Sequence, residues 1–153
     1  MISARMSEDA EGSIPRLSIT RAASSGTPDS EIWEISWRVA NLTREPLEIV
    51  EGWLPRGRFY SKKEAFAPPI ILSAVDNVLL SREVRCLVEP GEVIENAFLI
   101  LGGLFRDHLW RVLTRLRVER EASGAVRPVI EAVTAHPVGF ALPLKDPWPL
   151  PPA

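Results

Sequence analysis

Cys86, His108 and His136 are the residues whose types could support nucleophilic or metal-centred chemistry. A cysteine activated by a histidine can attack a carbonyl carbon, and thiolate and imidazole groups are common zinc ligands. Zinc ligands usually come in pairs a few residues apart, whereas these three are widely separated, and Cys86 lies in an apolar stretch where cysteine packs as a small hydrophobic side chain. The pattern favours a non-enzymatic protein without metal or cofactor. An enzyme or metal protein built on Cys86, His108 and His136 is the weaker alternative.

The composition is that of an ordinary globular domain, with 46% hydrophobic and 25% charged residues among 153. A chain of this length fits one domain and can bury a core without disulfides. The net charge of −2 argues against a dedicated nucleic-acid-binding protein. A single cysteine, together with no apolar stretch typical of a signal peptide or a membrane span, predicts a cytoplasmic protein.

Alternation of apolar and polar residues is the main structural pattern. Trp33, Ile35, Trp37 and Val39 alternate with polar residues, which predicts a strand with one buried face. We expect Trp33, Trp37 and Trp110 in the core. Turn-forming residues divide the chain into further strands, expected at about 17–23, 47–54, 70–73, 78–88, 93–101, 110–120 and 129–135.

The segment from Leu104 to Leu116 fits two structures. Its apolar residues fall on one face of a helix, but over 110–120 they also alternate with arginines. We favour a strand over 110–120, preceded by a break at residues 102–103 and a short helical turn over 104–108. Its arginines predict either a basic binding surface or, as we prefer, a solvated face paired with acidic residues.

Three regions are candidates for contact with a partner. The irregular segment 55–69 contains Arg58, Phe59 and Tyr60, and a long loop of this kind binds a partner or, as we favour, crosses between two sheets. A second loop holds Leu104 and Phe105.

The third region is the C-terminal tail, residues 143–153. It has five prolines and cannot join the interior of a sheet. It could dock in the groove of a partner, cover the protein's own sheet edge, or stay disordered. Its candidate contact residues are Trp148, Pro149 and Pro151.

Seven to eight short strands without a long helix predict an all-β fold, an immunoglobulin-like antiparallel β-sandwich with Greek-key connections. The sandwich is expected over 14–142, between a disordered N-terminal segment, 1–13, and a proline-rich tail, 143–153. The stretches WRVANLTREPLEI, EPGEVIENAFLIL and WRVLTRLRVERE…VIEAVTA resemble the B–C, E and F–G regions of bacterial cytosolic immunoglobulin-like domains. They are also faintly similar to the intracellular proteinase-inhibitor type of such domains.

These features predict a non-catalytic protein-interaction module, an accessory or scaffolding subunit of a cytosolic complex. Its partner would be another protein, bound through the tail, the 55–69 loop or an open sheet edge, and neither a membrane nor a nucleic acid. The resemblance implies one alternative, a proteinase-inhibitor-like binder that uses the same loops.

Overall fold

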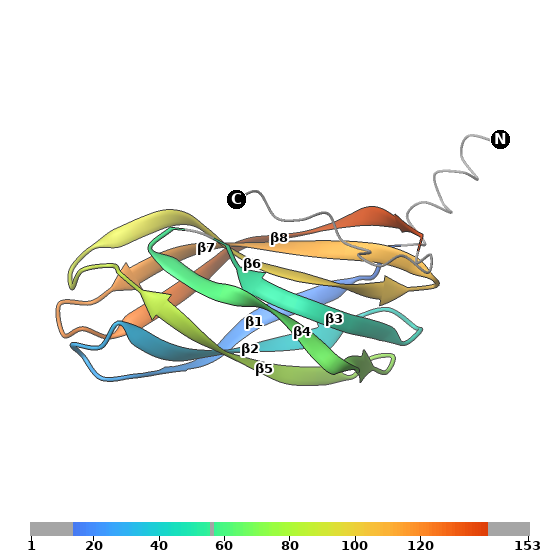
Figure 1. Cartoon of the computed structure of the whole chain (residues 1–153), viewed down its shortest axis with the longest axis horizontal. Coiled ribbons are helices and arrows are strands. Elements are labelled where there is room, and N and C mark those ends of the chain that lie inside the picture. The colour runs from blue at the N-terminus through green and yellow to red at the C-terminus, as the bar shows by residue number, and fades with distance from the viewer. Residues whose placement is uncertain (1–13, 56, 141–153) are drawn as a thin grey trace.

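The computed structural model describes residues 14–55 and 57–140 and shows, over those residues, eight antiparallel strands. They hydrogen-bond in the order β1-β2-β5-β4-β3-β6-β7-β8 and form one nearly closed sheet (Figure 1). The strands are β1 (Leu17–Ser25), β2 (Ile32–Asn41), β3 (Leu47–Leu54), β4 (Phe59–Leu72), β5 (Asn77–Cys86), β6 (Val93–Phe105), β7 (His108–Arg120) and β8 (Val126–Phe140). The all-β prediction is confirmed. Within the described residues we find no helix long and apolar enough to cross a membrane.

The sheet is nearly closed because β4 bonds with strands of both layers. Phe59 and Tyr60 pair with β5, whereas residues 61–72 pair with β3. The layer β1-β2-β5 is thereby joined to the layer β3-β6-β7-β8 along one side. On the other side, no ladder joins β1 to β8 within the described residues. There, the Ser24 hydroxyl donates a 2.8 Å hydrogen bond to the Val126 carbonyl.

The core lies between the two layers and contains the tryptophans expected from the sequence. Trp33, Trp37 and Trp110 are 5%, 0% and 0% exposed, which confirms their assignment to the core. On β7, alternate residues from Trp110 to Val118 are all buried. Since alternate side chains of a strand share one face, this row confirms that residues 110–120 form a strand.

The predicted break at Gly102 and Gly103 is wrong, as is the helical turn over 104–108. β6 continues to Phe105, and a two-residue turn at Arg106 and Asp107, both with positive φ, leads into β7. Positive φ at both central residues is typical of tight β-hairpins. A Cβ atom at Gly103 would clash with the Glu48 backbone and the Trp110 ring. Gly103 is therefore a point of close packing and not a strand end.

The predicted irregular segment 55–69 is also largely wrong, because most of it belongs to β4. The segment does cross between the two layers, but it does so as a strand. Pro68 and Pro69 are tolerated because they fall in a register shift between Ala65, which pairs with Glu51, and Ile70, which pairs with Ile49. Proline lacks the amide that a ladder needs, so it is found at such shifts and on edge strands.

A buried arginine holds together the connections at one end of the sheet. Arg120 is 7% exposed, and its guanidinium lies 5.9 Å from the centroid of the Trp33 ring. It donates hydrogen bonds of 2.6–3.1 Å to four carbonyl oxygens, those of Pro28 and Ser30 before β2, Val88 after β5 and Gly124 before β8. Two of these carbonyls belong to the buried residues Val88 and Gly124, where a carbonyl without a donor would be costly.

Asn41 has the same role at the opposite end of β2. Its side chain is fully buried, and its amide nitrogen donates to the carbonyls of Glu45, Leu72 and Ser73 at 2.8–3.2 Å. Its amide oxygen accepts a 2.9 Å bond from the Thr43 backbone N–H. The turn after β2 is thus tied to the end of β4.

Replacement of Trp37 by alanine should cost about 3–5 kcal/mol of unfolding free energy, because it leaves a large cavity in a closely packed core. Leu79→Ala is the control, since Leu79 is 47% exposed, and it should cost less than about 1 kcal/mol. Urea unfolding curves measure both variants. Similar losses for the two would contradict this description of the core.

Arg120→Lys should cost about 2–4 kcal/mol, because a lysine cannot reach four carbonyls at once and leaves buried acceptors without donors. Arg115→Lys, on the exposed face of the same strand, should leave the unfolding free energy nearly unchanged. The melting temperatures of the two variants test this, and an unchanged value for Arg120→Lys would refute the role of Arg120.

Candidate functional site

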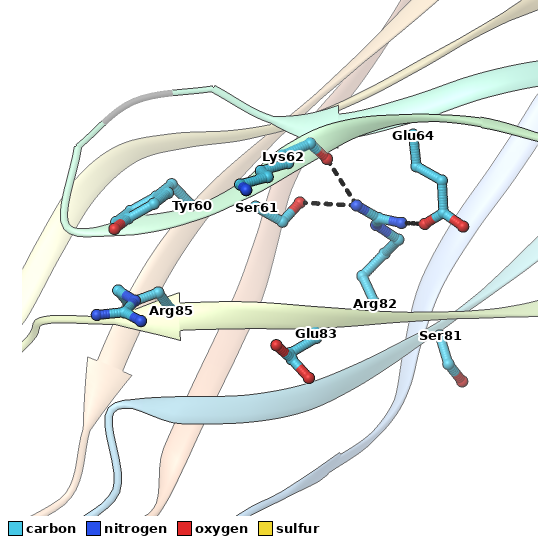
Figure 2. A pocket seen from close by; sticks show the side chains of 8 residues that line it. All are labelled: Tyr60, Ser61, Lys62, Glu64, Ser81, Arg82, Glu83 and Arg85. Carbon is cyan, nitrogen blue, oxygen red and sulfur yellow. Dashed lines mark hydrogen bonds and ion pairs between the residues drawn. The ribbon is translucent and has the colours of Figure 1, made fainter.

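A polar cleft of ≈ 610 Å³ opens where β4 separates from β5 and joins β3 (Figure 2). β4 and β5 pair only through Phe59–Cys86 and Tyr60–Arg85, among the residues that the structure describes. Beyond that point each strand follows a different layer. The cleft is lined by Tyr60, Ser61, Lys62 and Glu64 of β4 and by Ser81, Arg82, Glu83 and Arg85 of β5.

Arg82 occupies a position of β5 that faces the interior, between the buried residues Leu80 and Val84. Its side chain is 10% exposed and forms an ion pair with Glu64. It also donates a 2.6 Å hydrogen bond to the Lys62 carbonyl (Figure 2). If the β4–β5 pairing continued in register, that carbonyl would face the backbone of β5. The Arg82 side chain therefore replaces a missing part of the ladder.

The cleft is charged, with cations slightly in excess. Burial lowers the pKa of the Arg82 guanidinium, which nevertheless stays charged, as arginine does in proteins, and forms an ion pair with Glu64. The Arg82 Nε atom is buried and has no hydrogen-bond partner within the described part of the chain. Lys62 and Arg85 add positive charge at the rim, and Glu83 adds a negative one. A carbonyl or carboxylate group entering the cleft would find a donor at Arg82 Nε.

The edge of β5 that borders this cleft presents backbone groups. The Cys86 amide donates to Glu31, next to β2, and the Leu87 amide donates to Arg58, next to β4. Because the direction of backbone groups alternates along an antiparallel strand, even-numbered residues of β5 face β2 and odd-numbered residues face away. The amides and carbonyls of Leu79, Ser81 and Glu83 therefore point towards the side that β4 has left.

Two predicted contact residues belong to the core. Phe59 and Phe105 are 1% and 4% exposed, so the prediction that they form a contact surface is wrong. Both lie at inward positions of strands that the sequence analysis had described as loops. Leu104 is half-buried, on the outward side of β6.

Arg58 and Tyr60 lie at the surface near the cleft. Tyr60 is half-buried and lines the cleft, opposite Arg85 (Figure 2). Arg58 is exposed and holds Glu92 at 2.5 and 2.7 Å through two nitrogen atoms, and it donates to the Leu87 carbonyl at 3.0 Å. Trp148, Pro149 and Pro151 lie outside the described residues.

Cys86 and the two histidines are not brought together. Cys86 ends β5, near Arg120, and burial raises the pKa of its thiol. His108 begins β7 and pairs with Phe140, and His136 pairs with Arg111. Twelve residues of a strand separate His108 from Arg120, or about 40 Å. In the described residues, no three His, Cys, Asp or Glu side chains are grouped so that they could hold a metal ion.

Of the arginines of β7, Arg117 has acidic partners of the kind that the sequence pattern led us to expect. Arg117 contacts Glu119 at 2.9 Å and Glu131 at 3.5 Å, and Arg127 contacts Glu119 at 2.5 Å. Arg127 and Arg117 together lower the pKa of Glu119. This part of the face is a network of ion pairs across the sheet.

Comparison of the chain with protein-family models, curated proteins and solved structures found no match.

Arg82, Ser81 and Glu83, which line the cleft, were not among the candidate residues predicted from the sequence. A signal for Arg82 was present, because Val78, Leu80, Val84 and Cys86 form an apolar row with period two and Arg82 interrupts it. A charged residue at an inward position marks a strand edge or a site.

The stability of the protein should fall in acid partly through Glu92. Arg58, and then the Glu89 amide, lower the pKa of the Glu92 carboxyl to about 2. A carboxyl whose pKa is lower in the folded state stabilises the fold above its unfolded value and loses that effect as the pH falls. The wild type should therefore lose more unfolding free energy than Glu92→Gln as the pH falls from about 4.5 to about 2. Urea unfolding measured across this range tests the difference, and parallel pH profiles for the two proteins would contradict it.

Proposed function

We propose that this chain is a non-catalytic protein-interaction module that binds an extended segment of a partner protein along the free edge of β5. The observation that carries this proposal is the separation of β4 from β5, which turns the backbone groups of Leu79, Ser81 and Glu83 towards an open cleft. An added strand pairs with such groups through main-chain hydrogen bonds, and adjacent pockets provide specificity.

The side chains around this edge favour a selective partner over random pairing. Arg82 is an inward-facing charge, a feature by which sheet edges avoid uncontrolled association. A partner segment must supply an acceptor for Arg82 Nε, such as a carboxylate or amide oxygen, to avoid leaving that donor buried and unpaired. Leu79, 47% exposed beside the same edge, offers an apolar contact.

We further propose that the fold is a variant of the immunoglobulin-like sandwich. The order β1-β2-β5 followed by β4, with β3-β6-β7 in the other layer, matches the A-B-E-D and C-F-G arrangement of that fold, and β8 adds a strand after G. Strands β3, β4 and β5 are consecutive neighbours and β2 lies beside β5, as in a Greek key. On this assignment β6 corresponds to strand F, and not to strand E as the sequence resemblance implied.

A proline at position 83 provides a direct test. The Glu83 amide points away from β2, so Glu83→Pro removes a donor from the free edge and leaves the β2 ladder intact. Glu83→Ala is the matched control, because it removes the same side chain and keeps the amide. Tagged full-length proteins are expressed in the source cell, and co-purifying proteins are identified and quantified by mass spectrometry.

We expect a stoichiometric partner with the wild type and with Glu83→Ala, and its loss with Glu83→Pro at an unchanged melting temperature. Equal recovery of the partner by both variants would exclude binding at the β5 edge. A wild-type protein that purifies alone would overturn its role as an accessory subunit.

A further inference from the structure

A second surface of the protein lies on the outer side of the sheet, away from the β4–β5 cleft. Trp53 of β3 pairs with Ile100 of β6, whereas the next residue, Leu54, is part of the core. Because neighbouring side chains of a strand point to opposite faces, Trp53 points outward. It is nevertheless only 4% exposed. A tryptophan buried on the outer face of a sheet needs a reason other than the core.

Charged residues from three strands surround this ring. The Lys63 Nζ atom lies 4.8 Å from the centroid of the Trp53 ring, and the Arg111 Cζ atom lies 5.5 Å from it. Glu51, one alternate position before Trp53, forms a 3.4 Å ion pair with Lys63. Gly102 lies between Glu51 and Arg111 across the sheet and contributes no side chain. We call Trp53, Lys63, Arg111 and Glu51 the Trp53 platform.

The Trp53 platform offers an unused donor. The indole Nε1 atoms of Trp37, Trp53 and Trp110 are all buried without a hydrogen-bond partner within the described residues, but Trp37 and Trp110 lie in the core, and only Trp53 of the three lies on the outer face of the sheet. Buried tryptophan N–H groups usually find an acceptor. An aromatic ring on an outer face whose N–H lacks an acceptor is typical of surfaces that proline-rich segments cover. Such segments are already extended, lose little entropy on binding, and present carbonyl oxygens with few amides of their own.

The chain itself contains a segment of this chemistry. Residues 141–153 hold five prolines and Trp148. They also carry Lys145 and Asp146, whose charges complement Glu51 on one side and Lys63 and Arg111 on the other. In its proline content and in its charges, this segment therefore fits the Trp53 platform.

The distance also fits. β8 ends at Phe140, which pairs with His108, whereas Trp53 lies level with Ile100 and Leu113. Five residues along β7 and three strand spacings across the sheet, from β8 to β3, separate Phe140 from Trp53 by about 22 Å. The eight residues from Phe140 to Trp148 span about 25 Å as polyproline II helix. Trp148 can therefore reach the platform.

We propose that the C-terminal segment of the same chain docks on the Trp53 platform, with a carbonyl oxygen accepting the Trp53 indole N–H and Trp148 packed beside it. This interaction would fix the tail over β3, β6 and β7. It is independent of strand addition at β5, so each of the two proposals can fail without the other.

Paramagnetic broadening in the full-length protein tests this contact. Pro151→Cys is labelled with a nitroxide, and the tryptophan indole ¹⁵N–¹H signals are recorded before and after reduction of the label. Cys86 is fully buried, so the label should attach only at position 151, which the mass confirms. The Trp33 indole, which donates to Ser30 in the β1–β2 connection, is the internal control.

We expect the oxidised label to remove the Trp53 signal and to leave the Trp33 signal intact. Adding Trp148→Ala to the labelled protein should restore the Trp53 signal. A Trp53 signal that is unaffected by the label would overturn the proposal. Broadening that appears instead in a mixture of labelled ¹⁴N protein and unlabelled ¹⁵N protein would also overturn it, because the occupant would then be the tail of a second copy.

Discussion

The hydrogen-bonding demand of β4 is the constraint on which the rest of this structure depends. Every buried backbone amide and carbonyl needs a partner, and β4 meets that need with β5 over two residues and with β3 over the remainder. This change of partner joins the two layers into one nearly closed sheet. It also leaves part of the β5 edge without a strand beside it. The Arg82 side chain, bonded to the Lys62 carbonyl, compensates locally for the missing ladder.

The same demand explains how the ends of the sheet are held. With a single buried cysteine and no grouped metal ligands in its described residues, the protein relies on Arg120 and Asn41 there. Each side chain gathers carbonyl groups from connections distant in sequence. The proposed binding edge is the part of β5 that β4 has left, and among the described residues β1 and β8 are also neighbours without a ladder.

Several parts of the fold could be predicted from the sequence because they depend on local alternation. In β2 every second residue from Trp33 to Val39 is buried, and in β7 every second residue from Trp110 to Val118 is buried, so both strands show a period of two. β4 does not show it, because a register shift and Pro68–Pro69 interrupt the pattern and hide a strand inside an irregular sequence. The strand break predicted at Gly102–Gly103 was wrong for another reason. A glycine that makes room for Trp110 looks the same in a sequence as one that ends a strand.

The candidate sites likewise divide into features that local sequence reveals and features that depend on tertiary structure. The sequence by itself determined the all-β class and the burial of Trp33, Trp37 and Trp110, because burial of alternate residues leaves a direct trace in residue type. Only the tertiary structure decided that Phe59 is core, that β5 has a free edge and that Trp53 lies beside Arg111. These features depend on which strands become neighbours. Backbone hydrogen bonds hold paired strands together, and because nearly every residue offers the same backbone groups, the residues of one strand do not by themselves identify the strand beside it.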